Sequence, residues 1–176
     1  MTHHTLPMPC TEAQVRALRA GDTVTLETTL FGIRDATQIA MFDHGRRTRF
    51  DLRGHAVIHT APNVRRVGKG ASNEGVRLII GKGGLREESQ RAFAELGGAY
   101  LAVIGGAAAL ETTWITAIED VDLDDLNPES LWRFAIRGFG PLIVGMDAHG
   151  GSLYRGVNEA VAARRASVLA AMGVTP

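Results

Sequence analysis

The sequence predicts one mixed α/β domain. Segments rich in β-branched and apolar residues are interleaved with segments of helical spacing. Their order lacks the regular alternation of a doubly wound sheet. The 176 residues are 45% apolar and 22% charged, an ordinary globular composition with enough length for a full core. We therefore expect a mixed sheet with flanking helices in a single domain over residues 11–176, preceded by a loose N-terminal tail over residues 1–10.

The N-terminal half begins with clear helix and turn signals. Thr11 and Gln14 have the spacing of a capping box, in which each side chain satisfies a backbone amide of the other residue. Alternating β-branched and apolar residues follow a Gly-Asp turn, and Asp35 is placed to cap a helix that stops at Gly45. The predicted elements are a helix over 11–20, a strand over 23–31, a helix over 35–45, and strands over 55–59 and 76–80 around an irregular loop over 62–75.

The C-terminal half continues the mixture of helices and strands. Residues 86–96 have helical spacing and stop at a Gly-Gly pair, and the unbroken apolar run after it suits a buried strand. The acidic residues 119–125 are typical of a solvated face. The predicted elements are a helix over 86–96, a strand over 99–104, a tight turn over 105–110, a strand over 114–118, a helical turn over 128–132, strands over 134–136 and 141–144, and a helix over 154–172 that ends at Gly173.

Charge and hydropathy exclude several functional classes. Nineteen basic residues balance nineteen acidic ones, so no overall field would attract nucleic acid or an anionic membrane. No apolar run approaches the roughly 20 residues that span a bilayer, and the first residues lack the layout of a signal peptide. We expect a cytoplasmic protein that binds neither nucleic acid nor membrane.

Cysteine usage argues against a metal centre held by this chain alone. An iron–sulfur cluster is held by several thiolates, and a structural zinc site takes about four Cys or His ligands. Cys10 is the single cysteine of the chain. Among the histidines, His55 and His59 have i,i+4 spacing, but they fall in a predicted strand. We expect no metal or cofactor bound by this chain.

Two cations are candidates for anion binding. Lys82 follows an apolar strand and is flanked by glycines, which leave its ammonium group unshielded. The surrounding sequence lacks the other residues of a phosphate-binding loop. Arg34 stands at the predicted start of a helix, where its guanidinium could bind a carboxylate through two parallel hydrogen bonds. The alternatives are a solvated turn lysine and a surface ion pair.

A series of short motifs resembles one family. In order, they are residues 18–22 (Leu-Arg-Ala-Gly-Asp), 32–36 (Gly-Ile-Arg-Asp-Ala), 81–83 (Gly-Lys-Gly), 100–110 (ending Gly-Gly-Ala-Ala-Ala-Leu) and 131–132 (Leu-Trp). The series resembles the β subunit, or C-terminal domain, of class I fumarases and L-tartrate dehydratases over roughly residues 14–154.

The resemblance implies a swivelling β/β/α domain and a divided active site. In the family, the substrate lies between this domain and an α subunit whose own cysteines carry a [4Fe–4S] cluster. The family's arginine and lysine that contact the dicarboxylate correspond to Arg34 and Lys82. The iron would act as a Lewis acid on the leaving hydroxyl group, while a base removes the proton next to a carboxylate.

The sequence departs from the family pattern at two places. The histidine of the family's Arg-Asp-Ala-Ala-His motif is replaced by Gln38. A family segment with a threonine thought to act as the base and a second carboxylate-binding arginine is shortened here. In one alignment Ser72 or Asn73 takes the place of the threonine and Arg77 that of the arginine. A second alignment places this segment over residues 62–66.

Two functional hypotheses follow. In the first, the chain is the β-type subunit of a two-subunit iron–sulfur hydro-lyase for a small hydroxy dicarboxylic acid, active only with a cysteine-bearing α subunit. Its substrate-binding residues would be Arg34, Lys82, Arg77 and Asn73, with Ser72 as the catalytic candidate. In the second, the chain is a non-catalytic paralogue that binds carboxylates or acts as a scaffold, with a homodimer as its form when alone. An unrelated small-molecule-binding domain would require the motif series to be chance.

Overall fold

The computed structural model describes residues 1–59, 75–103 and 108–174. The helices are α1 (Glu12–Arg16), α2 (Asp35–Gln38), the π-helix η1 (Ile39–Asp43), α3 (Glu87–Leu96), α4 (Ala108–Thr113), the 3-10 helix η2 (Asp124–Leu126) and α5 (Leu153–Ala171). The strands are β1 (His3–Pro7), β2 (Thr23–Ile33), β3 (Ala56–His59), β4 (Leu78–Gly81), β5 (Ala99–Ala102), β6 (Ile115–Asp122) and β7 (Leu131–Met146).

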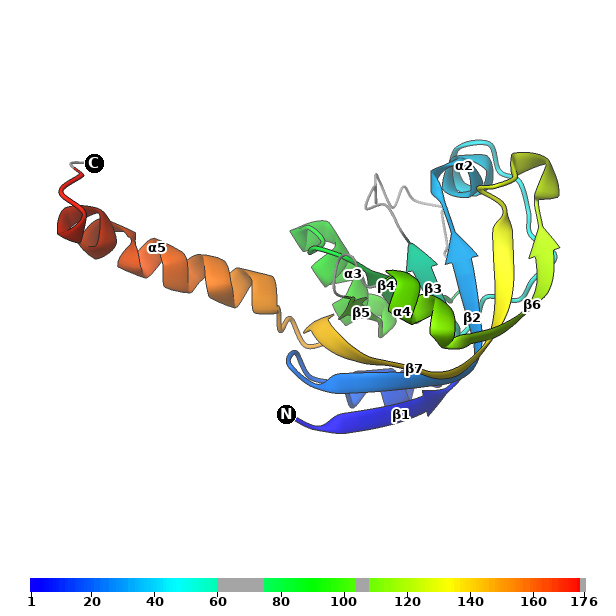
Figure 1. Cartoon of the computed structure of the whole chain (residues 1–176), viewed down its shortest axis with the longest axis horizontal. Helices are drawn as coiled ribbons and strands as arrows, with labels where there is room; N and C mark the ends of the chain where they lie inside the picture. The colour runs from blue at the N-terminus through cyan, green and yellow to red at the C-terminus, as the bar shows by residue number, and fades with distance from the viewer. Residues whose placement is uncertain (60–74, 104–107, 175–176) are drawn as a thin grey trace.

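Five of the strands close into a barrel (Figure 1). Strands β2, β3, β4 and β5 run parallel to one another, and the long strand β7 pairs antiparallel with both β5 and β2. Strand β1 adds to β2, and β6 adds to the other side of β7. The prediction of a mixed α/β fold with a mixed sheet and flanking helices is confirmed, and the arrangement is consistent with a swivelling β/β/α domain.

The main core lies inside the barrel, because each strand turns its apolar residues inward with a period of two. Leu26 and Leu30 of β2, Ile80 of β4 and Phe139 of β7 are completely buried. Each buried side chain of this size contributes about 1.5–3 kcal/mol relative to an exposed one. A second, smaller cluster lies outside the barrel and includes Phe31.

The N-terminus is part of the sheet, so the expectation of a loose tail over residues 1–10 is wrong. Residues His3–Pro7 pair with Thr23–Glu27 in parallel register. Leu6 and Met8 are buried in the main core, and the backbone N–H of Thr2 donates to Asp22 at 2.7 Å. The short, proline-containing segment gave no strand signal of its own, because its stability comes from pairing with β2.

Helix α2 begins differently from the prediction. The N-cap residue is Arg34, in an extended conformation and without a side-chain capping bond. Asp35 is the first helical residue rather than the cap, and the helix continues directly into η1. Asp35 is thereby free to pair with a residue outside its own helix.

Strand β7 replaces three predicted elements. The helical turn expected over residues 128–132 is wrong, since η2 ends at Leu126 and Leu131 already begins the strand. The two short strands predicted after it are one continuous strand. Gly138 and Gly140 have positive φ angles that are accommodated within the strand, where the pairing with β2 shifts register.

Helix α5 projects away from the barrel, and none of its residues is buried (Figure 1). In the described part of the chain, no helix is both long and apolar enough to cross a membrane.

Candidate functional site

The carboxyl ends of the parallel strands meet at one edge of the barrel, where ligands bind in many α/β folds. Arg34 directly follows β2, His59 ends β3, and Lys82 directly follows β4. Ile33 is in register with His59, and Ile58 with Ile80. The backbone positions of Arg34 and Lys82 are thus two strands apart, about 10 Å at the usual spacing.

The guanidinium group of Arg34 is largely free. Its side chain is 46% exposed, and its one ion pair with a described residue joins Nη2 to Glu129 Oε1 at 3.6 Å. It donates no hydrogen bond to any residue that the structure describes. Because a guanidinium carries five N–H donors, Arg34 retains the capacity for a bidentate contact with a carboxylate.

Glu129 joins this arginine to the start of α2. Its Oε2 accepts the backbone N–H of Ala36 at 2.8 Å, and its backbone carbonyl accepts a short hydrogen bond from the Thr37 hydroxyl. Both hydrogen bonds join residues that are separated by about half of the sequence, and they attach the turn before β7 to the helix. Glu129 is therefore fixed at its backbone and at one carboxylate oxygen, while the other oxygen faces Arg34.

His59 adds a second polar pair to the same edge. Its Nε2 lies 3.3 Å from Oδ1 of Asp35, and its side chain is 8% exposed. Burial lowers the pKa of His59, although the Asp35 carboxylate opposes this shift. The imidazole is thus mainly neutral near pH 7.

Lys82 lies in an open turn at the end of β4. It is exposed, and it forms no hydrogen bond or ion pair with the described residues. Gly83 follows with a φ of 82°, which a residue with a side chain rarely adopts. Burial raises the pKa of Glu111 in α4, and the charge of Lys82 counteracts this shift. Lys82 is therefore near enough to α4 to act on Glu111 electrostatically.

Arg77 lies at the opposite end of β4 and does not join the strand-end residues. Its Nη2 is 2.9 Å from Glu12 Oε2, and its Nη1 donates to the carbonyl oxygens of Leu96 and Gly97. These contacts tie α1 to the end of α3. The other sequence candidates, Ser72, Asn73 and the alternative segment 62–66, lie outside the described residues.

The described residues do not fit an iron–sulfur cluster. Cys10 is buried, its thiol donates to the Gly54 carbonyl oxygen at 3.2 Å, and burial raises its pKa to about 11. The thiolate that would bind iron is therefore disfavoured. Within residues 1–59, 75–103 and 108–174, no three His, Cys, Asp or Glu side chains gather where they could hold a metal ion.

Sequence reasoning weighed His59 only as a metal ligand, and it missed Glu129. The place of His59 at this edge could have been inferred, because it is the last residue of an apolar strand, just as Lys82 directly follows one. Glu129 gave no signal, since it lies in a predicted helical turn and reaches α2 only through the closure of the barrel. Asp35 was noticed for its position, but its partner was not foreseen.

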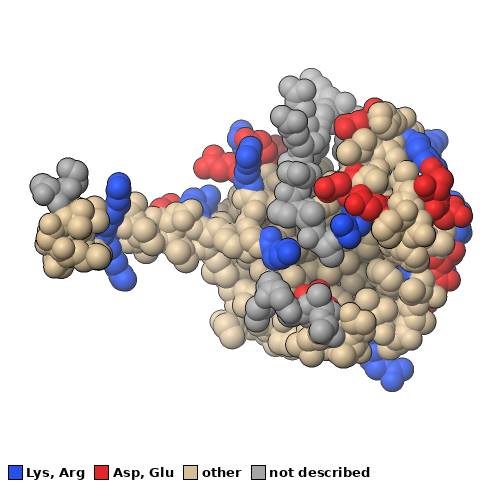
Figure 2. Space-filling view, turned by 45° about the horizontal axis from the view of Figure 1, so that its top comes forward, with Lys and Arg blue, Asp and Glu red and all other residues tan. Residues whose placement is uncertain are grey.

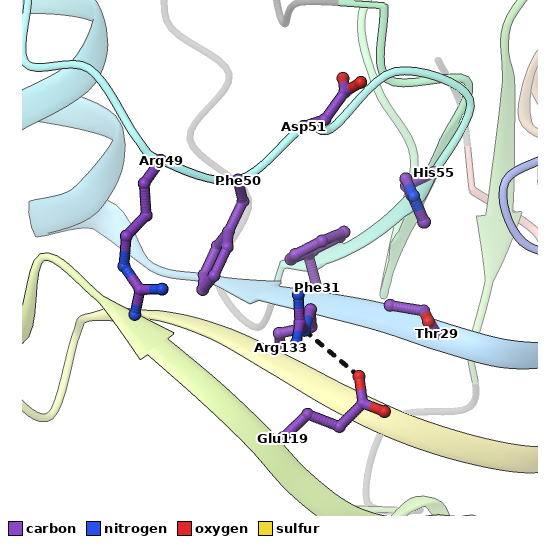
Figure 3. A pocket seen from close by; sticks show the side chains of 8 residues that line it. All are labelled: Thr29, Phe31, Arg49, Phe50, Asp51, His55, Glu119 and Arg133. Carbon is purple, nitrogen blue, oxygen red and sulfur yellow. Dashed lines mark ion pairs between the residues drawn. The ribbon is translucent and has the colours of Figure 1, made fainter.

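A separate hollow of about 340 Å³ lies on the outer face of the barrel (Figure 3). Phe31 and Phe50 form its apolar part, while Arg133 pairs with Glu119 at 3.2 Å and the carboxylate of Asp51 points away from that pair. The remaining lining residues are Thr29, Arg49 and His55. None of the strand-end residues Arg34, His59 or Lys82 lines it.

The charged residues around both regions are largely balanced. Arg46 pairs with Asp125 and Arg49 with Asp120, each through two short hydrogen bonds. On the face shown in Figure 2, acidic and basic side chains lie beside one another on the globular body. The acidic run over residues 119–125, which covers the end of β6 and the start of η2, is thus not merely solvated, because it pairs with arginines of the segment before β3.

Comparison with known proteins gives a consistent relationship. The family model described as "Fumarase C-terminus" matches residues 67–157, more than half of the chain. A putative L(+)-tartrate dehydratase subunit beta of Methanocaldococcus jannaschii is 32% identical over 86% of this chain and 91% of its own length. The L(+)-tartrate dehydratase subunit beta of Escherichia coli is 30% identical over 91% and 90%, respectively.

A longer relative is similar to this chain over only part of its length. A putative class I fumarate hydratase of Geobacillus stearothermophilus is 33% identical over 88% of this chain, which spans about a third (34%) of that protein. The β-subunit relatives are matched over nearly their whole length. On the family match and these identities together, the chain belongs to the fumarase C-terminus family.

Proposed function

We propose that the chain is the β-type subunit of a hydro-lyase that acts on a small hydroxy dicarboxylic acid of the fumarate, malate and tartrate class. The proposal is supported by the similarity to tartrate dehydratase β subunits over almost their full length. In this function the chain binds the carboxylates of the substrate, and a partner protein completes the active site.

The observation that carries the proposal is that Arg34 has free hydrogen-bond donors at the strand-end edge, the edge of the barrel where the parallel strands β2, β3 and β4 end. Several other arginines of the described chain are occupied by hydrogen bonds, as Arg49 and Arg77 are. Arg34 has one ion pair at 3.6 Å and no hydrogen bond among the described residues, so most of its donors remain available. Lys82, which pairs with none of the described residues, places a second cation two strands away. Two cations about 10 Å apart at the backbone, on flexible side chains, suit the two carboxylates of a four-carbon acid.

The partner in this proposal is a cysteine-bearing α subunit that holds the [4Fe–4S] cluster. The chain corresponds to about a third of a class I fumarate hydratase, which leaves two thirds of such a protein to be supplied separately. The buried, protonated thiol of Cys10 is unsuited to the cluster. Departure of the hydroxyl group is accordingly assigned to the partner, and carboxylate binding to this chain.

The proposal retains Ser72 as the candidate for removing the proton next to a carboxylate, with Asn73 beside it as a substrate-binding residue. A serine at this position would keep the hydroxyl group of the family's threonine. Arg77 is left out of the proposed site, because its guanidinium is held by Glu12 and two carbonyl groups at the other end of β4.

The experiment is to produce the chain together with its α subunit without oxygen and to follow the interconversion of malate with fumarate and the dehydration of tartrate. Arg34→Ala and Lys82→Ala should each lower kcat/KM at least about 30-fold, equivalent to about 2 kcal/mol for a lost charged contact. Arg91→Ala, an exposed arginine of α3, is the matched control and should retain activity.

Two results would count against the proposal. Full activity of both Arg34→Ala and Lys82→Ala would remove these residues from the site. An assembled pair that converts none of the three acids would exclude the hydro-lyase function. Binding of the same acids to the chain alone, measured by calorimetric titration, would then favour the non-catalytic carboxylate-binding paralogue. The oligomeric state of the chain alone would show whether it forms the homodimer expected for that alternative.

A further inference from the structure

Glu129 divides its carboxylate between two partners at the strand-end edge. Oε2 accepts the Ala36 amide at 2.8 Å, a normal hydrogen bond, whereas Oε1 lies 3.6 Å from Arg34 Nη2. The side chain is 32% exposed, and the backbone carbonyl of the same residue is held by Thr37. The carboxylate is thus anchored on one side and presented to Arg34 on the other.

We propose that Glu129 is a positioning residue that holds the Arg34 guanidinium in place for a substrate carboxylate. The inference rests on the proposed function, because it gives Arg34 the carboxylate as its ligand. Within the described chain, Glu129 is the single ionic partner of Arg34. Without it, the long arginine side chain would sample many rotamers.

The physical basis is pre-organisation. An arginine side chain loses conformational entropy when it is immobilised in one rotamer. When Glu129 restrains Arg34 before the substrate arrives, part of this loss has already occurred. The 3.6 Å contact involves a single guanidinium nitrogen, so the other donors remain available for two parallel hydrogen bonds.

A competing effect has the opposite sign. Glu129 is negatively charged and lies beside the group that would bind an anion, so its charge also repels a dicarboxylate. If repulsion dominated, removing the charge would tighten binding and lower KM. If positioning dominates, removing the charge weakens binding and raises KM. The direction of the change therefore decides between the two effects.

Glu129→Gln is the informative variant. The amide oxygen of glutamine can still accept the Ala36 N–H, whereas the charge that faces Arg34 is lost. We expect KM for the dicarboxylate to rise about 5-fold, with kcat within 2-fold of the parent and an unchanged melting temperature. Glu119→Gln, which removes the carboxylate that pairs with Arg133 on the outer face, is the control and should leave KM unchanged.

Two further measurements test whether Glu129 acts through Arg34. In an Arg34→Lys background, Glu129→Gln should change KM less than 2-fold, because the group that it positions is already altered. On the chain without its partner, the side-chain N–H signal of Arg34 in nitrogen-15 NMR should show greater mobility in Glu129→Gln than in the parent. The Arg34→Lys variant assigns that signal by its loss.

The outcomes separate this inference from the proposed function. Unchanged Arg34 mobility in Glu129→Gln, or a KM that stays the same or falls, would overturn the positioning role even in a fully active enzyme. An inactive assembled pair would count against the hydro-lyase function and, with it, against a substrate carboxylate as the ligand of Arg34. Greater Arg34 mobility together with the KM increase, absent in the Arg34→Lys background, would support the positioning role.

Discussion

Nε2 of His59 lies 3.3 Å from Oδ1 of Asp35, which joins the last residue of β3 to the first residue of α2. His59 is nearly buried, and Asp35 is partly exposed beside Arg34. The pair therefore links the barrel to the proposed carboxylate-binding arginine. Because His59 can take up a proton, the stability of this region should depend on pH.

The first prediction concerns acid stability. Burial lowers the pKa of His59 below its value in an unfolded chain, so the unfolded state binds a proton more readily. This contribution to stability is complete above the ordinary pKa of about 6.5 and is lost as the pH falls through the lower, folded pKa. His59→Gln should accordingly lose less stability than the parent between pH 7.5 and 5.

Urea unfolding of the chain at several pH values tests this prediction. His44→Gln, at an exposed position after η1, is the control and should follow the parent. The pKa of His55 is also lowered by burial, so His55→Gln should show a change of the same sign. A parent and a His59→Gln variant with the same pH dependence would contradict the interpretation.

The sequence predicted those elements whose stability is local or strongly periodic. Leu26 and Leu30 follow the strand period, and Gly97 ends α3 in the left-handed conformation expected of a C-terminal glycine. Strand β1 was missed because its burial depends on pairing with β2. Lys82 and Arg34 could be proposed from their neighbours, whereas Glu129 requires the contact between distant segments that only the folded chain creates.

The second prediction concerns Arg77, which the sequence placed in the substrate site. Because it bonds Glu12 and the carbonyl groups that end α3, Arg77→Ala should lower the free energy of unfolding by about 1–3 kcal/mol. KM for a dicarboxylate should remain within 2-fold of the parent. Chemical denaturation and steady-state kinetics of the same preparation give both values. A stable variant with a strongly raised KM would return Arg77 to the site.

The third prediction concerns Asp147, which directly follows β7 and is only 3% exposed. It accepts the backbone amides of Ala20, His149 and Gly151, each at 2.8 Å. Asp147→Ala leaves these donors without their acceptor and should cost about 1–3 kcal/mol or more. At roughly 2–4 °C per kcal/mol for a chain of this size, the melting temperature should fall by several degrees.

Calorimetry of Asp147→Ala beside Asp124→Ala tests this assignment. Asp124 is exposed in η2, and its side chain accepts no hydrogen bond from the described residues, so its loss should hardly change the melting temperature. Equal melting temperatures for the two variants would show that the buried amides find other partners.

The fourth prediction compares two glycines that differ in what surrounds them. Gly97 has a φ of 69°, and a Cβ atom there would lie 2.6 Å from Cγ of Glu12. Gly97→Ala should therefore cost about 1–2 kcal/mol for the left-handed conformation, and further energy if Glu12 must leave Arg77. Gly156 lies within α5 with no atom near enough to obstruct a Cβ, so Gly156→Ala should favour the helix by about 1 kcal/mol.

Two readouts distinguish these effects, because α5 projects from the barrel and contributes little to its core. Urea unfolding of the barrel should shift to lower concentration in Gly97→Ala and stay unchanged in Gly156→Ala. Circular dichroism on heating should show that α5 retains its helix to higher temperature in Gly156→Ala. If Gly97→Ala unfolded at the same urea concentration as the parent, the C-terminus of α3 would have to tolerate an ordinary residue. The ion pair between Glu12 and Arg77 would then have to persist although a Cβ atom at position 97 would lie 2.6 Å from Cγ of Glu12.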